Sequence, residues 1–128
     1  MKTTAARRCP CQGGTLTRFL QPSILALLLQ GPDHGYGLLQ KLSQSRLWHE
    51  DAPDAAGLYR TLHDMEERGL ITSRLTPESQ AGLGKRVFSL TDEGRRCSVS
   101  WLRTLSDYRR GLDDVIALLR DGTGETGV

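Results

Sequence analysis

The sequence predicts a mostly α-helical fold with one small β-hairpin, followed by a long C-terminal helix. Three observations lead to this prediction. An amphipathic helical segment stops at Gly69 and runs directly into a β-branched stretch, a second short strand leads into a helix start at Thr91, and an apolar heptad pattern runs through residues 98–119. A chain of 128 residues with 38% hydrophobic content can bury one core but not two. We therefore expect a single small domain.

Two helices are expected before the amphipathic segment. Residues 22–32 form a short apolar run that glycine and proline end, and it is too short to span a bilayer, so it predicts a buried helix. The motif His34-Gly35-Tyr36-Gly37 announces a second helix over the leucines that follow. His34 is expected to pack or cap in the turn before this helix rather than to bind a metal.

The third helix presents different residues on different faces. Its apolar residues can share one face, with four- and three-residue steps at the start and a five-residue step at the end, at Leu58, Leu62, Met65 and Leu70. Tyr59, Arg60 and His63 remain on faces that can contact something else. Asp54 is the expected N-cap, after a turn at residues 48–51, and Gly69 is the expected left-handed C-cap.

A hairpin and a last helix complete the expected order. Residues 71–76 and 86–90 have strand character, and residues 77–84 between them have the composition of a turn. Thr91 then offers an N-cap, with acidic residues in the first helical turn where the helix dipole favours them. Three helices, two strands and a long helix in this order are the pattern of a winged helix-turn-helix.

The last helix carries the repeat of a coiled coil. The apolar seam follows a 3-4 spacing over about three heptads, at Ser98, Trp101, Leu105, Tyr108, Leu112, Val115 and Leu119. Because a winged helix of this size offers little other core for the seam to cover, we expect a two-fold dimer rather than intrachain packing. Residues 121–128, rich in glycine, are expected to form a frayed tail.

The ordered set of motifs from about residue 20 to 119 resembles the PadR family of transcriptional regulators. The resemblance is carried by His34-Gly35-Tyr36, by Leu58-Tyr59 with Leu62, by Glu67-Arg68-Gly69-Leu70-Ile71 and by Leu90-Thr91-Asp92-Glu93-Gly94. It implies DNA binding, dimerisation through the C-terminal helix and a response to small molecules, often flat aromatic ones. This chain departs from many relatives at Gly57-Leu58-Tyr59-Arg60, where they have threonine-leucine-tyrosine-proline.

The expected organisation has four parts: a basic cysteine-containing arm (1–19), a winged helix-turn-helix domain (20–90), a dimerisation helix (91–120) and a flexible tail (121–128). The arm has arginines and a lysine but no acid, which fits either a solvated arm or a minor-groove contact. No long apolar run follows these basic residues, so we expect no secretory signal, no membrane contact and a cytoplasmic protein.

A net charge of +2 is too small to argue nucleic-acid binding, so the argument depends on where the charges lie. In the expected complex the third helix contacts the groove or its phosphates, the second helix contacts the adjacent backbone, and the wing adds a further contact. The residues assigned to these contacts are Tyr36, Lys41, Tyr59, Arg60, His63, Lys85 and Arg86. The two tyrosines match family motifs, and the alternative for both is a place in the core.

Three cysteines are not explained by DNA binding. Cys9 and Cys11 lie in the basic arm, and Cys97 lies at the start of the long helix. Together they could ligate zinc or an iron-sulfur cluster, or the first two could form a redox pair whose thiol pKa values nearby arginines would lower. The alternative is an unstructured arm with unremarkable cysteines.

The sequence shows no phosphate-binding glycine loop, no paired metal-binding histidines and no nucleophilic triad, so we expect no enzyme. It predicts a homodimeric repressor on a pseudo-palindromic double-stranded DNA operator, released by a small molecule, a metal or a redox signal. Trp101 and Tyr108 could line a pocket for a small aromatic effector, or they could be plain core. The alternative function is a winged-helix module that binds a protein partner, which a weak dependence of affinity on salt would reveal.

Overall fold

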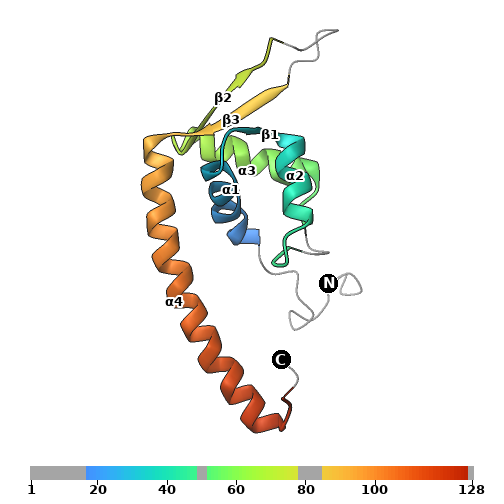
Figure 1. Cartoon of the computed structure of the whole chain (residues 1–128), viewed down its shortest axis with the longest axis vertical. Helices are drawn as coiled ribbons and strands as arrows, with labels where there is room; N and C mark the ends of the chain where they lie inside the picture. The colour runs from blue at the N-terminus through green and yellow to red at the C-terminus, as the bar shows by residue number, and fades with distance from the viewer. Residues whose placement is uncertain (1–16, 49–51, 78–84, 127–128) are drawn as a thin grey trace, which may run out of the picture.

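The computed structural model describes residues 17–48, 52–77 and 85–126 (Figure 1). Helices predominate, and a small sheet lies at one end of the helical domain. The elements are η3 (Thr17–Phe19), α1 (Leu20–Leu29), β1 (Asp33–His34), α2 (Gly35–Ser43), α3 (Ala55–Glu67), β2 (Ile71–Leu75), β3 (Arg86–Leu90) and α4 (Asp92–Thr123). Three helices, a hairpin and a long helix follow one another as the sequence predicts, which confirms the winged helix-turn-helix fold.

Polar side chains fix where three of the helices begin. His34, Asp54 and Thr91 each accept a hydrogen bond from the backbone N–H three residues further on, at 3.2, 2.8 and 3.0 Å. These bonds satisfy N–H groups that have no partner within the helix. The three capping predictions are confirmed, and Gly69 has a left-handed φ of 80° just after α3, as expected.

The sheet is antiparallel and has the order β1-β3-β2. The hairpin pairs Ile71 with Leu90 and Leu75 with Arg86, and a further backbone bond joins Thr76 to Lys85. The first strand is an addition to the sequence prediction. It has two residues, and so short a strand shows no alternation that a sequence pattern could reveal.

One apolar core joins α1, α2, α3 and the sheet. Its buried hydrophobic residues are Leu20, Ile24, Leu25, Leu28, Leu38, Leu42, Trp48, Leu58, Leu62, Met65, Leu70, Ile71 and Phe88. Trp48 is only 2% exposed, and its indole Nε1 donates to the Ser23 hydroxyl at 2.9 Å. The sequence predicted a turn at residues 48–51, so Trp48 is an unexpected core residue, and residues 49–51 lie outside the described ranges.

The first half of α4 packs against the start of the chain. The Phe19 ring lies 6.4 Å from the Trp101 ring and 6.0 Å from the Tyr108 ring, measured between centroids. The Trp101 indole also donates to the Gln21 side-chain oxygen at 2.7 Å. Two of the predicted seam aromatics therefore cover the chain's own N-terminal segment. Phe19, which the sequence prediction assigns to the arm, takes part in this packing.

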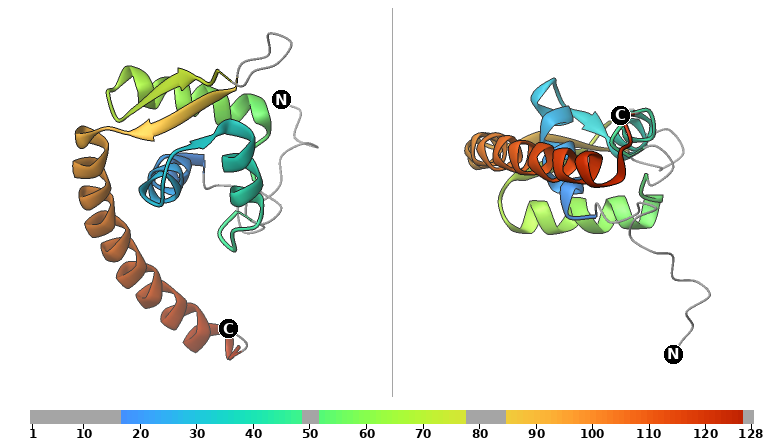
Figure 2. Two further views of the ribbon diagram at one scale, coloured as in Figure 1. Left: turned by 45° about the horizontal axis from the view of Figure 1, so that its top comes forward. Right: turned by 90° about the horizontal axis from the view of Figure 1, so that it is seen from below.

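The second half of α4 extends beyond the helical domain, as Figure 1 and the left view of Figure 2 show. Every residue from 107 to 119 is exposed. The helix continues to Thr123, past the predicted end at residue 120, and stops where Gly124 takes a left-handed φ of 77°. Within the described ranges no helix combines the length and the apolar character that crossing a membrane requires.

Candidate nucleic-acid interface

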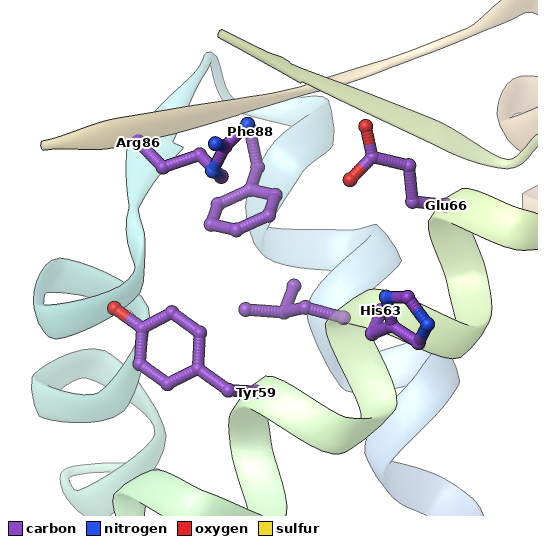
Figure 3. Close-up of a pocket in the computed structure, with 6 residues that line it drawn as sticks. Tyr59, His63, Glu66, Arg86 and Phe88 are labelled. Atoms are coloured by element: carbon purple, nitrogen blue, oxygen red, sulfur yellow. The ribbon is translucent and has the colours of Figure 1, made fainter. Parts of the chain in front are cut away.

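A cleft separates the exposed face of α3 from strand β3. It has a volume of about 320 Å³, and the residues that line it are Tyr59, Leu62, His63, Glu66, Arg86 and Phe88. Figure 3 shows Tyr59, His63 and Glu66 along α3, facing Arg86 and Phe88 of the strand. Residues 59, 63 and 66 recur at helical spacing, so a single face of α3 presents all three. Polar groups from two elements therefore converge on this surface.

Tyr59 lies at the end of the cleft next to α2. Its ring centroid is 6.4 Å from that of Phe88, and the residue is 47% exposed. A Cβ atom on Gly35 would lie 2.0 Å from the Tyr59 hydroxyl oxygen, so the glycine makes room for this tyrosine. Tyr59 is thus a partly exposed surface residue whose ring lies beside Phe88, and the alternative of a core position is wrong.

Tyr36 and Lys41 lie on α2. Tyr36 is 63% exposed, which also rules out a core position, and its hydroxyl accepts from the Gln40 side chain at 3.2 Å. The Lys41 ammonium lies 2.8 Å from an Asp33 carboxylate oxygen. Partial burial raises the pKa of Asp33, but hydrogen bonds from Lys41 and His34 outweigh this effect and hold the pKa below its ordinary value. The carboxylate therefore offsets part of the Lys41 charge.

A polar network ties α3 to the wing. Glu66 accepts hydrogen bonds from the Ser73 backbone N–H at 3.1 Å and from the Ser73 hydroxyl at 3.0 Å. Arg86 in turn donates from Nη1 to the Ser73 hydroxyl oxygen at 3.0 Å. The predicted wing residue Arg86 is therefore held by Ser73 of β2, which is itself held by α3, the predicted recognition helix.

The other predicted contact residues are solvent-exposed. Arg60 and Lys85 are exposed, and the His63 side chain is 74% exposed with its Nε2 atom 3.3 Å from a Glu67 oxygen. Residues 78–84, which connect β2 and β3 in the sequence, lie outside the described ranges. The structure thus brings Tyr59, His63 and Arg86 together around one cleft, whereas Tyr36 and Lys41 lie on α2 and do not line it.

The cysteine prediction can be examined only at Cys97, because Cys9 and Cys11 lie outside the described residues. The Cys97 sulfur is 3.8 Å from the Gln21 side-chain oxygen. Burial, and then the negative charge of Glu93, raise the pKa of this thiol, so Cys97 is a poor thiolate at neutral pH. Among the described residues no group of three or more His, Cys, Asp or Glu side chains is arranged to hold a metal ion.

Sequence reasoning gave no role to Glu66, Ser73 or Asp33. The position of Glu66 on the same helical face as Tyr59 and His63 was a usable signal. Ser73 and Asp33 gave none, because Glu66 and Lys41, the side chains that they contact, lie on other elements at distances that the sequence does not set.

The fold and this surface define a winged helix-turn-helix protein with its recognition helix and wing exposed on the same side. Residues 24–98 match the model of the transcriptional regulator PadR-like family, and the chain belongs to this family. The members of this family are transcription regulators and not enzymes, which confirms the prediction of a regulator. A comparison with curated protein sequences gave no significant match.

Solved structures support the same assignment. A protein from Thermoplasma acidophilum assigned as a transcriptional regulator is 25% identical, with a TM-score of 0.69 over 80% of this chain and 94% of that chain. A PadR family regulator from Clostridium difficile shares the fold at 18% identity, with a TM-score of 0.65 over 77% of this chain and 98% of that chain. Bacillus subtilis PadR in complex with operator DNA is 29% identical, with a TM-score of 0.59 over 66% of this chain and 46% of that chain. This chain therefore spans less than half of the Bacillus protein.

Proposed function

We propose that the protein binds double-stranded operator DNA, with α3 in the major groove and the β2–β3 wing on the adjacent backbone. The observation that carries this proposal is the cleft between α3 and β3, which places Tyr59 and His63 opposite Arg86. A helix in the major groove and a wing beyond it must straddle the phosphate strand that separates the two grooves. Hydroxyl, imidazole and guanidinium groups all donate hydrogen bonds to phosphate oxygens. The structure of the Bacillus relative in complex with operator DNA supports the proposal that the partner is operator DNA.

The second half of α4 supports the proposal of a homodimer. Leu112, Val115 and Leu119 are 57, 51 and 60% exposed, and they lie on the projecting part of the helix. Exposed apolar residues at heptad spacing on a single helix are stabilised when another helix covers them. Such a dimer would present two recognition helices to two half-sites of a pseudo-palindromic operator.

A groove between α1 and α4 offers a place for the partner's helix. It has a volume of about 470 Å³ and a mainly apolar lining that includes Leu25 and Leu29 of α1 and Val99, Leu102 and Leu105 of α4. We assign its occupant as the C-terminal half of α4 from a second copy. The seam and the groove lie on the same chain, so a two-fold axis would let each copy fill the groove of the other.

We also propose which signal would release the repressor from DNA. A second cavity of about 420 Å³ includes the predicted aromatics Trp101 and Tyr108 together with Phe19, and the basic side chains Arg18 and Arg68. The cavity is also lined by Asp64, which forms an ion pair with Arg68 at 2.9 Å, so it is the aromatic rings that favour a small aromatic effector. A metal or an oxidant acting at Cys9, Cys11 and Cys97 is the other predicted signal. Action on chromosomal DNA would place the protein in the cytoplasm.

The salt dependence of binding to a labelled DNA duplex of about 30 base pairs, which spans roughly three helical turns, tests the DNA proposal. Wild-type affinity measured by fluorescence anisotropy should fall steeply with salt, and Arg86→Ala should reduce the slope of log K against log salt by about one unit. Arg103→Ala is the matched control, because Arg103 is an exposed arginine on α4, away from the cleft. Binding that does not depend on salt would favour the alternative of a protein-interaction module. An unchanged slope for Arg86→Ala would remove the wing from the interface.

A further inference from the structure

Ser73 is tied to Glu66 through both its backbone and its side chain. The Ser73 N–H lies 3.1 Å from Oε2 of Glu66, and the Ser73 hydroxyl lies 3.0 Å from each carboxylate oxygen. Both residues are partly buried. One of these bonds comes from the backbone of Ser73 and the others from its side chain. Because the backbone itself is bonded, β2 is held at a fixed distance from α3.

The chemistry of the hydroxyl then sets the direction of the next bond. A serine hydroxyl has one proton to donate and lone pairs that accept, whereas an ionised carboxylate only accepts. The hydroxyl proton must therefore point toward Glu66, which leaves a lone pair for Arg86. Arg86 Nη1 donates to this oxygen at 3.0 Å. Arg86 therefore donates to Ser73, and Ser73 donates to Glu66.

The hydrogen-bonded chain of Arg86, Ser73 and Glu66 forms a relay. The sheet register places this relay on the side of the wing that faces α3. Ile71, Ser73 and Leu75 alternate onto one face of β2, and Ile71 is buried against the core. Arg86 pairs with Leu75 across the hairpin and lines the cleft with Tyr59 and His63. The guanidinium has further N–H groups besides the one that Ser73 engages, and these are available to a phosphate.

We propose that Glu66 and Ser73 are positioning residues that fix the Arg86 guanidinium for DNA backbone contact. The inference rests on the proposed DNA-binding function and adds two residues to it that do not themselves touch DNA. A long arginine side chain loses rotamer freedom when it binds a phosphate, and a partner that holds it beforehand reduces that entropic cost. The relay also joins the recognition helix and the wing into one unit, so that both meet the DNA in a fixed relation.

The opposite expectation follows if Glu66 has no positioning role. A carboxylate in a DNA-facing cleft repels phosphate, so its removal alone would raise the affinity for any duplex. Equally, if Ser73 holds Arg86 back from DNA, its removal would strengthen binding. The positioning role predicts weaker binding in both cases, so the direction of the change distinguishes the two ideas.

The test measures anisotropy of the same labelled duplex with Ser73→Ala, Ser73→Thr, Glu66→Gln and Arg86→Ala, and with the double variant of Ser73→Ala and Arg86→Ala. Immobilising one rotamer-rich side chain accounts for about 0.5–1.5 kcal/mol, so Ser73→Ala should weaken binding by roughly 2- to 13-fold. Ser73→Thr retains a hydroxyl and should restore most of the affinity. Thr72→Ala is the matched control, because it removes a hydroxyl from the exposed opposite face of the same strand.

The double variant separates positioning from a structural effect. If Ser73 acts only through Arg86, Ser73→Ala should cause no further loss when Arg86 is already alanine. Glu66→Gln should weaken binding even though it removes a negative charge, because an amide can also donate and no longer fixes the direction of the hydroxyl. Circular dichroism melting of each variant verifies that the fold is retained.

Three outcomes would overturn the relay: Ser73→Ala binding like wild type, either Ser73→Ala or Glu66→Gln binding more tightly, or full additivity in the double variant. These outcomes can be told apart from failure of the proposed function. If the proposed function is wrong, wild-type protein itself would not bind the duplex, or Arg86→Ala would leave the slope of log K against log salt unchanged.

Discussion

Gly94 allows α4 to start directly against the strands, and Gly94→Ala should therefore destabilise the protein. A Cβ atom at this position would lie 2.1 Å from the Leu70 carbonyl oxygen and 2.8 Å from a Leu90 methyl carbon. The methyl group of a leucine side chain can move, but the Leu70 oxygen belongs to the backbone. That oxygen also accepts from the Thr91 N–H at 3.1 Å and from the Thr91 hydroxyl at 3.0 Å.

The size of the effect follows from these contacts. Reaching an ordinary contact of 3.4 Å requires the helix and the carbonyl to separate by more than an ångström. That movement disrupts the backbone bond from Thr91, worth about 1 kcal/mol, and adds strain of about 1–3 kcal/mol. Alanine regains about 1 kcal/mol over glycine within a helix. We therefore expect a net loss of about 1–3 kcal/mol in the free energy of unfolding.

Urea denaturation followed by circular dichroism measures this loss, with Gly111→Ala as the control. Gly111 lies in the same helix, and a Cβ there meets nothing within 4 Å. The control should be more stable than wild type by about 0.5–1 kcal/mol, because only helix propensity changes. Both variants are compared at one protein concentration, since the unfolding of a dimer depends on it. If Gly94→Ala were as stable as Gly111→Ala, the close approach of α4 to the strands would be refuted.

Two further predictions concern association and the cysteines. Leu112→Lys should shift the protein to monomer in sedimentation, because it places a charge in the exposed seam. Asp113→Lys changes the charge by two units beside the seam and should leave the dimer intact, and a Leu112→Lys protein that is still a dimer would exclude the seam. In a variant whose other two cysteines are serine, Cys97 should react with iodoacetamide more slowly than a free thiol at pH 8, since burial and Glu93 raise its pKa. The rate of its alkylation should still be rising at a pH where that of a free thiol has levelled off. An alkylation rate equal to that of free cysteine would contradict the raised pKa and would favour Cys97 as a redox sensor.

Local chemistry explains why much of the fold could be predicted from the sequence. Asp54 and Thr91 cap their helices through side chains that reach only three residues along the chain, so adjacent sequence determines them. The hairpin strands were placed to within one residue, because apolar alternation and turn composition are also local signals. Gly69 was recognised as a left-handed residue on the same grounds.

Contacts between distant segments explain what was missed. Phe19 was assigned to the arm, although it packs on Trp101 and Tyr108 more than eighty residues later in the chain. The heptad pattern of α4 could not show that its first half covers the chain's own α1 while its second half remains exposed, since the spacing is the same throughout. Glu66 and Ser73 lie seven residues apart on different elements, so only the structure brings them into contact.

The start of α4 connects the two halves of the proposed mechanism. Thr91 lies between β3 and α4, where it caps α4. Its hydroxyl also donates to the carbonyl oxygen of Gly69, just after α3, at 2.6 Å, so the start of α4 is bonded to the end of the recognition helix. Gly94 lets the helix leave this point without a gap. In the proposed dimer the direction of α4 at this joint sets the separation of the two recognition helices. Because half-sites repeat at about 34 Å per turn of DNA, a small rotation of α4 would move one recognition helix out of its groove. In the proposed mechanism a ligand in the cavity beside Trp101 and Tyr108 would contact α4 directly and could cause such a rotation.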